Sequence, residues 1–242
     1  MRVAVNGAAG RMGRVLVDLV EQAPDLELSG QGEHSAPLGP EPLAATDVVI
    51  DFSLPQGTHA LLGVLDGQAL VVGTTGLGPA TLALLQAYSA RAPVVFASNY
   101  STGVTLLFGL AAQAASVLSD YHVEIVEMHH ARKRDAPSGT ALSLGRVIAE
   151  ARCVDLDERA RHGREGEVGP RTQAEIGFHA VRGGDVAGEH TVYLAGPGER
   201  LTLGHLATSR QAFATGAIRA ARWVPGQPPG LYDMQDVLGL KA

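Results

Sequence analysis

Three glycines near the beginning of the chain constrain its fold more than any other feature of the 242-residue sequence. Gly7, Gly10 and Gly13 follow a short apolar run at residues 3–5 and lead into a segment with helical spacing. Glycines in such a strand–helix turn let the backbone approach a pyrophosphate, whose charge the start of the helix stabilises. An ordinary strand–helix turn is the alternative interpretation of the glycines alone. The spacing predicts a dinucleotide site at the start of an α/β domain.

The first hundred residues alternate apolar runs with helical patterns, which predicts an α/β, Rossmann-like, doubly wound domain. Apolar runs that close at Gly, Asp or Ser are typical of buried parallel strands. We expect strands at residues 3–5, 26–28, 48–52, 70–72 and 94–97, and helices at 12–20, 58–65 and 81–88. The Gly- and Pro-rich segment 30–42 is expected to be a loop.

The pattern changes after Asn99 and predicts a smaller α+β domain with a mostly antiparallel sheet. A small-residue helix is expected over residues 102–118, a strand over 123–128, and a polar loop up to the next helix, which begins near Thr140. Strand-like runs separated by glycine turns follow at residues 176–181, 191–194 and 201–206. A last helix over residues 213–223 and a Pro- and Gly-rich tail complete the chain.

Composition excludes several classes of protein. The formal net charge of −6 opposes a nucleic-acid surface, which needs clustered positive charge. The one cysteine, Cys153, excludes an intrachain disulfide and fits a reducing compartment. The sequence has no signal-peptide hydrophobic region and no apolar run of about 18 residues. We therefore expect a cytoplasmic protein with no nucleic-acid or membrane partner.

An acidic residue stands where a dinucleotide fold places its ribose ligand. Glu33 lies about 20 residues beyond Gly13, just past the second expected strand, where a carboxylate can bind the adenosine ribose hydroxyls. A solvated loop charge is the alternative. A carboxylate repels a 2′-phosphate and favours NADH, whereas a protonated His34 partly reverses that preference. The sequence leaves the choice between NADH and NADPH open.

Two further strand ends carry hydroxyl-rich turns, VGTTG at residues 72–76 and ASNYS at residues 97–101. Ligands of open α/β sheets gather at the carboxyl ends of strands, so both turns are candidates for the nicotinamide side of a coenzyme site. Turns that cap the following helices are the alternative interpretation.

The densest chemistry lies between residues 127 and 140, where five of the six residues from 129 to 134 are basic or titratable. Adjacent strand residues point to opposite faces and no HExxH pattern is present, so His129 and His130 predict no metal site. Anion binding with proton transfer fits better, because histidine and Lys133 both exchange protons. The first amides of the following helix, at Gly139 and Thr140, are able to bind a carboxylate. A solvated charge run is the alternative.

The run EMHHARKRDAPSGTA, residues 127–141, closely resembles the signature of the 4-hydroxy-tetrahydrodipicolinate reductase family, formerly called dihydrodipicolinate reductases, of lysine and diaminopimelate biosynthesis. The resemblance extends over nearly the whole chain. It includes GAAGRMGR at residues 7–14, both hydroxyl-rich turns, IGFHAVRGGDVAGEHT at 176–191 and GLYDMQDVL at 230–238. The central signature is highly specific, whereas the glycine pattern alone is not.

The resemblance implies an NAD(P)H-dependent reductase of a small cyclic imine dicarboxylate. His129 would donate and accept a proton and Lys133 would donate one, while His130, Gly139 and Thr140 would bind the substrate's carboxylates. The residues implied at the NADH or NADPH site are Gly7, Ala8, Ala9, Gly10, Arg11, Met12, Glu33, Gly73, Thr74, Thr75, Ala97, Ser98, Asn99 and Tyr100. The resemblance also implies a homotetramer built by the second domain's sheet. It implies a coenzyme domain of residues 1–101 and 210–242 around a substrate-binding and oligomerisation domain of residues 102–209.

The chain departs from the family pattern at Ala131, often an arginine, and at His34, where some members carry an arginine that binds the 2′-phosphate. Other functions compete with the reductase. A semialdehyde dehydrogenase needs a nucleophilic cysteine, but Cys153 lies in a structural context. A sugar or inositol dehydrogenase leaves the PSGT segment unexplained, and an NADH-sensing regulator would bind the coenzyme without turnover.

Overall fold

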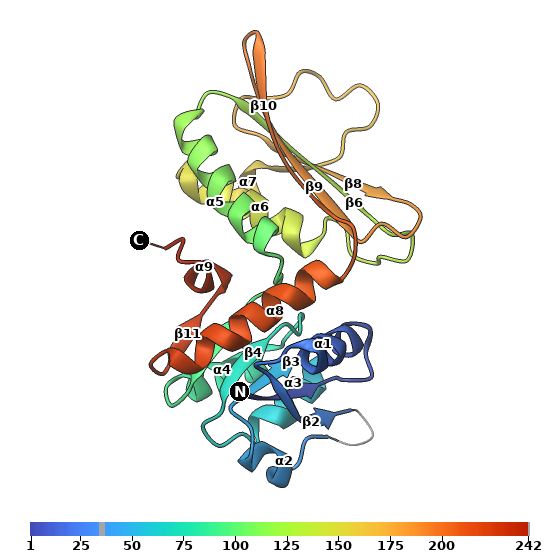
Figure 1. Cartoon of the computed structure of the whole chain (residues 1–242). Coiled ribbons are helices and arrows are strands. Elements are labelled where there is room, and N and C mark those ends of the chain that lie inside the picture. The colour runs from blue at the N-terminus through green and yellow to red at the C-terminus, as the bar shows by residue number, and fades with distance from the viewer. Residues whose placement is uncertain (34–36, 242) are drawn as a thin grey trace. The chain divides into compact units, whose positions relative to one another are not determined.

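The structure is a computed structural model and describes residues 1–33 and 37–241 (Figure 1). The chain divides into two compact units, one of Met1–Thr102 with Arg210–Ala242 and one of Gly103–Ser209. Each unit has its own sheet and its own core. His34, which bears on the expected coenzyme choice, lies outside the described residues. Within the described ranges, no helix has the length and apolar character needed to cross a membrane.

The first unit is the doubly wound α/β domain that the sequence predicts. Its six strands pair in parallel in the order β11-β5-β4-β3-β1-β2. The strands are β1 (Arg2–Asn6), β2 (Glu27–Gly32), β3 (Val48–Asp51), β4 (Ala69–Val72), β5 (Pro93–Phe96) and β11 (Gly230–Tyr232). The helices are α1 (Arg11–Gln22), α2 (Pro40–Ala44), α3 (Pro55–Leu62), α4 (Pro79–Ser89), α8 (Gln211–Trp223) and α9 (Met234–Val237), with a 3₁₀ turn at Val224–Gly226.

The two faces of this sheet are covered by different helices. Successive strand residues point to opposite faces. Val3 and Val5 of β1 pack with Leu16 of α1 and Ala217 of α8, whereas Ala4 belongs to a second core that includes residues of α2, α3 and α4. Helices α1 and α8 lie side by side on one face (Figure 1). A helix near the beginning of the chain, α1, and a helix near its end, α8, therefore form one layer on this face of the sheet.

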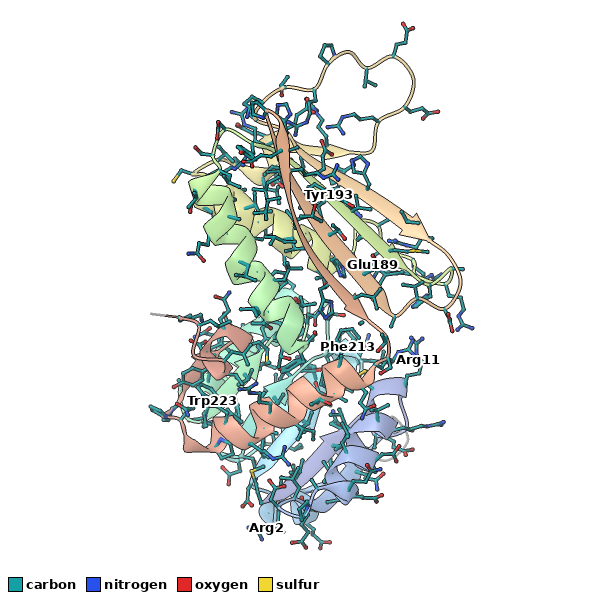
Figure 2. All side chains as sticks on the ribbon, turned by 45° about the horizontal axis from the view of Figure 1, so that its top comes forward. Arg2, Arg11, Glu189, Tyr193, Phe213 and Trp223 are labelled. Carbon is teal, nitrogen blue, oxygen red and sulfur yellow. The ribbon has the colours of Figure 1, made fainter. Side chains whose placement is uncertain are left out.

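Two segments of the first unit are more ordered than the sequence predicts. The expected loop at residues 30–42 is wrong in part, because β2 continues to Gly32 and α2 begins at Pro40. The glycines of β2 are packing residues: a Cβ on Gly32 would lie 2.5 Å from the Asn6 side-chain oxygen. The Pro- and Gly-rich tail forms β11 and α9. Trp223, labelled in Figure 2, packs its ring edge against Tyr232 of β11 with 5.2 Å between centroids.

The second unit is a five-stranded sheet with helices packed against one face. The strands are β6 (His122–His129), β7 (Ala160–His162), β8 (Ile176–Arg182), β9 (Gly188–Gly196) and β10 (Glu199–Ala207), and the helices are α5 (Thr102–Val117), α6 (Gly139–Ala151) and α7 (Leu156–Arg159). Burial alternates strictly along β6. Its buried residues Val123 and Ile125 pack with Ala111 of α5 and with Leu144 and Ile148 of α6. The same buried face continues to Glu127 and His129 at the strand's end.

This second sheet is mixed, with the order β10-β9-β6-β8-β7. Strand β9 is antiparallel to both β6 and β10, as the glycine turns predict. Strand β8 is parallel to β6 and β7. Helices α6 and α7 carry the chain from the end of β6 to the start of β7, and residues 163–175 carry it from the end of β7 to the start of β8. Each connection is a crossover that returns the chain in the same direction, so β6, β7 and β8 all run the same way.

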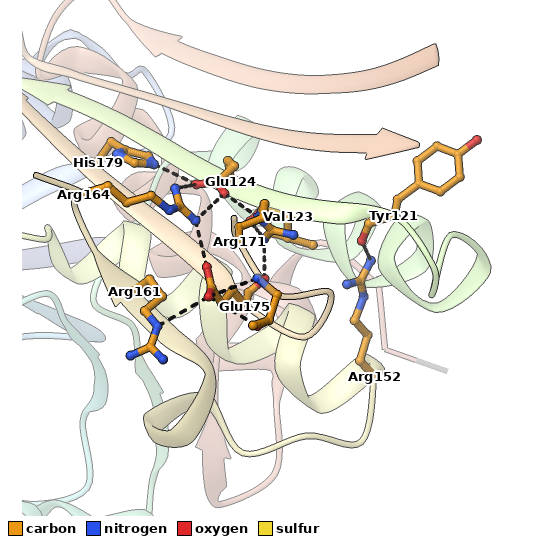
Figure 3. Close-up of polar contacts among 10 residues, drawn as sticks. Tyr121, Val123, Glu124, Arg152, Arg161, Arg164, Arg171, Glu175 and His179 are labelled. Carbon is orange, nitrogen blue, oxygen red and sulfur yellow. Dashed lines mark hydrogen bonds and ion pairs between the residues drawn. The ribbon is translucent and has the colours of Figure 1, made fainter. Parts of the chain in front are cut away.

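A network of arginines joins the segment before β8 to the other face of β6 (Figure 3). Glu124 of β6 accepts hydrogen bonds from Arg164 at 2.9 and 3.1 Å, Arg171 at 3.1 Å and His179 at 2.7 Å. Burial alone would raise the pKa of Glu124, but the bonds from Arg164 and His179 outweigh it and lower the pKa. Strand β6 is therefore held by a carboxylate on each face, with Glu127 on the helix side.

Candidate active site

The turn between β1 and α1 is a backbone cradle with no room for side chains. Gly7 has a φ of +84°, and a Cβ there would lie 2.6 Å from the carbonyl oxygen of Phe52. A Cβ on Gly13 would lie 2.0 Å from the carbonyl oxygen of Gly7. Gly10 is the N-cap of α1, and in the described part of the chain no side chain caps this helix. The first amides of α1 are therefore able to bind an anion.

Part of this turn is tied to the end of β2. The amides of Gly7 and Ala8 both donate to the carbonyl oxygen of Gly32, at 2.8 and 3.0 Å, and the Gly10 amide donates to Gly7 at 2.9 Å. These three hydrogen bonds fix the shape of the turn. Arg11, labelled in Figure 2, is the exposed first residue of α1.

Glu33 lies beside the glycine turn. It follows Gly32 directly, is exposed, and lines a hollow together with Ala8, Ala9 and Arg14. The structure thus brings together the glycine turn and the expected ribose ligand, which are separate in sequence. The cradle, the uncapped helix start and the carboxylate fit a dinucleotide.

A buried carboxylate organises the neighbouring strand ends. Asp51, at the end of β3, is fully buried and accepts hydrogen bonds from Asn6 at 2.8 Å, Ser53 at 2.6 Å, Thr58 at 2.5 Å and Thr74 at 3.0 Å. The hydroxyl of Thr74 is directed to this carboxylate, while Thr75 beside it is exposed. Sequence reasoning missed Asp51, although an acid ending an otherwise apolar strand is a visible signal.

The turn after β5 is fixed by the buried side chain of Tyr100. Its hydroxyl lies 2.9 Å from the carbonyl oxygen of Val72 and 3.0 Å from that of Val95, joining β4 to β5. Burial raises the pKa of Tyr100 well above its usual value. Its ring lies 5.4 Å from that of Phe52.

Phe52 in turn fills the space beside Gly73, where a Cβ would lie 2.2 Å from the ring. The phenol of Tyr100 is therefore a core group, and Phe52 is a residue of this edge that the sequence did not single out. Among the other expected positions, Ala97 is half-buried and Ser98 exposed, and the Asn99 side chain accepts from the Ser101 amide at 2.8 Å.

In the second unit, the end of β6 carries a second buried carboxylate. Glu127 is 1% exposed. Arg182 donates to both of its oxygens, at 2.7 and 2.8 Å, and the Ser138 amide donates at 3.0 Å. His129 Nδ1 lies 2.5 Å from Oε2 of the same carboxylate. Burial would raise the pKa of Glu127, but Arg182, His129 and Ser138 outweigh it, so the pKa is lowered and the group is ionised at neutral pH.

His129 is 9% exposed and is surrounded by charged and titratable groups. Burial lowers its pKa, Glu127 raises it, and Lys133 and Arg182 lower it further, with a net lowering. An ionised carboxylate only accepts hydrogen bonds, so Nδ1 of neutral His129 carries the proton and Nε2 is the free basic nitrogen. A Cβ on Gly188 would lie 3.1 Å from Nε2, so this glycine leaves room beside it.

In the loop after β6, backbone hydrogen bonds and an ion pair with Asp135 fix the position of Lys133. The amide of His130 donates to Val186 at 2.9 Å and that of Lys133 to His130 at 3.1 Å. The Lys133 ammonium lies 2.9 Å from Asp135. Nδ1 of His130 is buried and has no hydrogen-bond partner within the described residues, so it is available to a ligand.

Helix α6 starts next to the same carboxylate. Ser138 is its N-cap and accepts from the Ala141 amide at 3.2 Å, while its hydroxyl lies 3.0 Å from Nε2 of His190. The Cβ position of Gly139 is open. Burial lowers the pKa of His190 to about 3, so this histidine is neutral.

The structure thus brings His129 and the start of α6 to one carboxylate, with Arg182 at its centre. Sequence reasoning assigned no role to Glu127, Ser138, Arg182 or His190, although all four lie in the segments that carry the family resemblance. Within residues 1–33 and 37–241, no group of three or more potential ligands is placed to hold a metal ion.

Comparisons with known proteins agree in both halves of the chain. The family model described as "Dihydrodipicolinate reductase, N-terminus" matches residues 1–100, and that described as "Dihydrodipicolinate reductase, C-terminus" matches residues 103–238. The 4-hydroxy-tetrahydrodipicolinate reductase of Alkalilimnicola ehrlichii is 48% identical over 264 residues, covering 99% of each chain. That of Halorhodospira halophila is 45% identical over 263 residues, covering 98% of each.

Among solved structures, a dipicolinate-bound dihydrodipicolinate reductase from Paenisporosarcina sp. TG-14 is 28% identical. It has a TM-score of 0.75 and the match covers 98% of both chains. The DAP dehydrogenase of C. glutamicum, solved in complex with DAP, is 14% identical with a TM-score of 0.56, which shows a shared fold.

Proposed function

The chain belongs to the dihydrodipicolinate reductase family, and from that premise we propose which of its residues carry out the family's reaction. It is an oxidoreductase of lysine and diaminopimelate biosynthesis that uses NADH or NADPH. The reaction reduces the dehydrated form of 4-hydroxy-tetrahydrodipicolinate, a cyclic imine dicarboxylate, to tetrahydrodipicolinate. The observation that carries the residue assignment is the shared carboxylate of Glu127, on which His129 and the start of α6 converge.

The first unit supplies the coenzyme site in this proposal. When bound, the coenzyme supplies hydride. The glycine turn from Gly7 to Gly10 and the first residues of α1, Arg11 and Met12, would hold the pyrophosphate, and Glu33 the adenosine ribose. The exposed Thr75 and Ser98 would line the nicotinamide side, while Tyr100 and Thr74 shape that edge from beneath. Glu33 favours NADH, because a carboxylate repels a 2′-phosphate.

The second unit supplies the substrate site. His130 and the amides of Gly139 and Thr140 would bind the two carboxylates of the substrate, supported by the open space at Gly139. Loss of the 4-hydroxyl group as water leaves a carbon–carbon double bond conjugated with the imine, and C4 of the ring then accepts hydride. Negative charge develops toward the ring nitrogen. Lys133 would stabilise this charge and donate the proton that completes the reduction, while His129 would accept and donate protons at Nε2.

We also propose the domain roles and the assembly. Residues 1–101 with 210–242 form the coenzyme domain, and residues 102–209 bind substrate and build a homotetramer that works in the cytoplasm. The single cysteine supports a reducing compartment, and family membership supports the tetramer. Light scattering on the purified protein measures the assembly directly, and a monomer would contradict it.

A coupled assay tests the function and the residue roles together. Pyruvate and aspartate semialdehyde are condensed by the preceding synthase, and coenzyme absorbance is followed separately with NADH and NADPH. We expect substrate-dependent oxidation of coenzyme that is lost in His129→Gln and Lys133→Ala. Both variants should bind NADH as the wild type does, because neither residue belongs to the first unit. The proposal would be contradicted if folded wild-type protein binds NADH but does not oxidise NADH or NADPH when the substrate is supplied.

A further inference from the structure

The buried carboxylate of Glu127 contacts two parts of the proposed substrate site. Glu127 receives His129 on one oxygen and the Ser138 amide on the other. The hydrogen bond from the Ser138 amide fixes the start of α6, whose first two residues are Gly139 and Thr140. The side chain of Glu127 therefore holds both the imidazole of His129 and the start of the helix whose amides are proposed to bind the substrate's carboxylates.

Arg182 extends this connection to the loop that carries Lys133. Its NH2 group donates to Oε1 of Glu127 at 2.7 Å and also to the carbonyl oxygen of Asp135 at 2.8 Å. The Asp135 carboxylate in turn lies 2.9 Å from the Lys133 ammonium. The guanidinium fork thus joins the end of β8, the end of β6 and the lysine loop.

A buried ion pair of this kind is weak evidence for a stabilising role, because desolvation of both charges offsets their attraction. Val123 and Ile125 on this face of β6 are apolar, and His129 is the residue that the carboxylate contacts. Replacement of a buried ion pair by an apolar pair is often neutral for stability. The pair therefore calls for a role other than stability, and its contacts indicate what that role is.

We propose that Glu127 and Arg182 are positioning residues for the reduction: Glu127 holds His129 with its proton on Nδ1, leaving Nε2 to exchange the catalytic proton, and Arg182 fixes the lysine loop to the same carboxylate. This inference rests on the proposed function for its kinetic consequences. The geometry of the imidazole is independent of that function.

Replacement of Glu127 by glutamine tests the proposed role of Glu127 in holding His129. Each oxygen of Glu127 has two donors: Arg182 and Ser138 at Oε1, and Arg182 and His129 at Oε2. Of these donors only the imidazole is able to become an acceptor, so the glutamine oxygen takes the place of Oε1. Its NH2 group then faces Nδ1 of His129, which has to accept a hydrogen bond and move its proton to Nε2. The basic nitrogen is lost without loss of volume.

We expect Glu127→Gln to lower kcat by about 100-fold or more, the usual contribution of a positioned acid–base group. The limb of the kcat/KM pH profile that reports His129 should also move to lower pH, because the negative charge nearest the imidazole is gone. The charged groups that remain beside His129, Lys133 and Arg182, both oppose its protonation. NADH affinity should be unchanged.

Glu124→Gln is the matched control. Glu124 lies on the opposite face of β6 and has the same chemistry, with arginine and histidine donors on its carboxylate. Its loss should lower the melting temperature but leave kcat and the pH profile unchanged. Arg182→Lys keeps a cation beside Glu127, so the proton of His129 should stay on Nδ1. The variant loses the guanidinium that joins Glu127 to the Asp135 carbonyl, so turnover should fall because the loop that carries Lys133 is no longer fixed.

Nitrogen NMR of the histidine side chains reads the tautomer directly, with no need for turnover. We expect Nδ1–H at His129 in the wild type and in Arg182→Lys, and Nε2–H in Glu127→Gln. An unchanged tautomer, or an unchanged pH profile in an active Glu127→Gln variant, would overturn the proposal. If the wild type has the Nδ1–H tautomer but reduces no cyclic imine, the proposed function fails and the positioning geometry stands.

Discussion

His190 is buried in the second unit without charge, and its replacement by glutamine should change how stability depends on pH. The side chain is 3% exposed, and burial, followed by the neighbouring His129, lowers its pKa from 6.5 to about 3. In the unfolded chain the same group titrates near its ordinary value. Between these two pKa values the unfolded state binds a proton that the folded state does not, so His190 makes stability fall as the pH falls.

The size of the effect follows from those two values. At about pH 5 the difference is worth about 2 kcal/mol, and at about pH 7.5 it is close to zero. Urea unfolding followed by far-ultraviolet circular dichroism at both pH values gives the loss of stability for the wild type and for His190→Gln. We expect the variant to lose about 2 kcal/mol less on acidification.

The glutamine offers Ser138 a hydrogen bond in place of Nε2, and any constant cost of the substitution cancels between the two pH values. An equal loss of stability in the two proteins would refute the conclusion that His190 is held neutral by the fold.

Three further changes test the first unit. Gly13→Ala should weaken NADH binding by about tenfold or more, because its Cβ would lie 2.0 Å from the Gly7 carbonyl oxygen and the phosphate turn must move; Gly39→Ala, where the Cβ position is open, is the control in a fluorescence titration. Glu33→Gln should lower the ratio of NADH to NADPH affinity, and an unchanged ratio would remove Glu33 from the ribose site. Tyr100→Phe should cost about 1 kcal/mol of stability in urea unfolding, because it removes the hydroxyl donor that lies between the carbonyl oxygens of Val72 and Val95. No loss would show that water replaces the hydroxyl.

The local features of the first unit were predictable from the sequence because they depend on neighbouring residues. The step from strand to glycine turn to helix at residues 3–13 follows from spacing alone, and the structure confirms it. Glu33 at the end of β2 follows from the same rule. The extent of β2 did not follow, because the glycines of residues 30–32 indicate a loop until their tight packing against Asn6 and Pro42 is known.

The contacts that define the candidate site in the second unit join residues distant in sequence, and local patterns do not report them. Glu127 and Arg182 are 55 residues apart and meet only because β6 and β8 pair in parallel, with His129 opposite Arg182 in the register. The strand-like runs in the sequence carry no signal that this particular pair is parallel. The same limit applies to Asp51, whose four donors come from four different segments, and to Tyr100, whose polar surroundings in sequence conceal a buried ring.

The central claim, that this chain transfers hydride to a cyclic imine dicarboxylate, is tested most directly by following the transferred atom. The reaction is run with coenzyme that carries deuterium at the transferable position of the nicotinamide, and the tetrahydrodipicolinate formed is analysed by mass spectrometry and NMR. We predict one deuterium per product molecule, bound to C4 of the ring. Coenzyme oxidation that yields unlabelled product, or label at another carbon, would contradict the account.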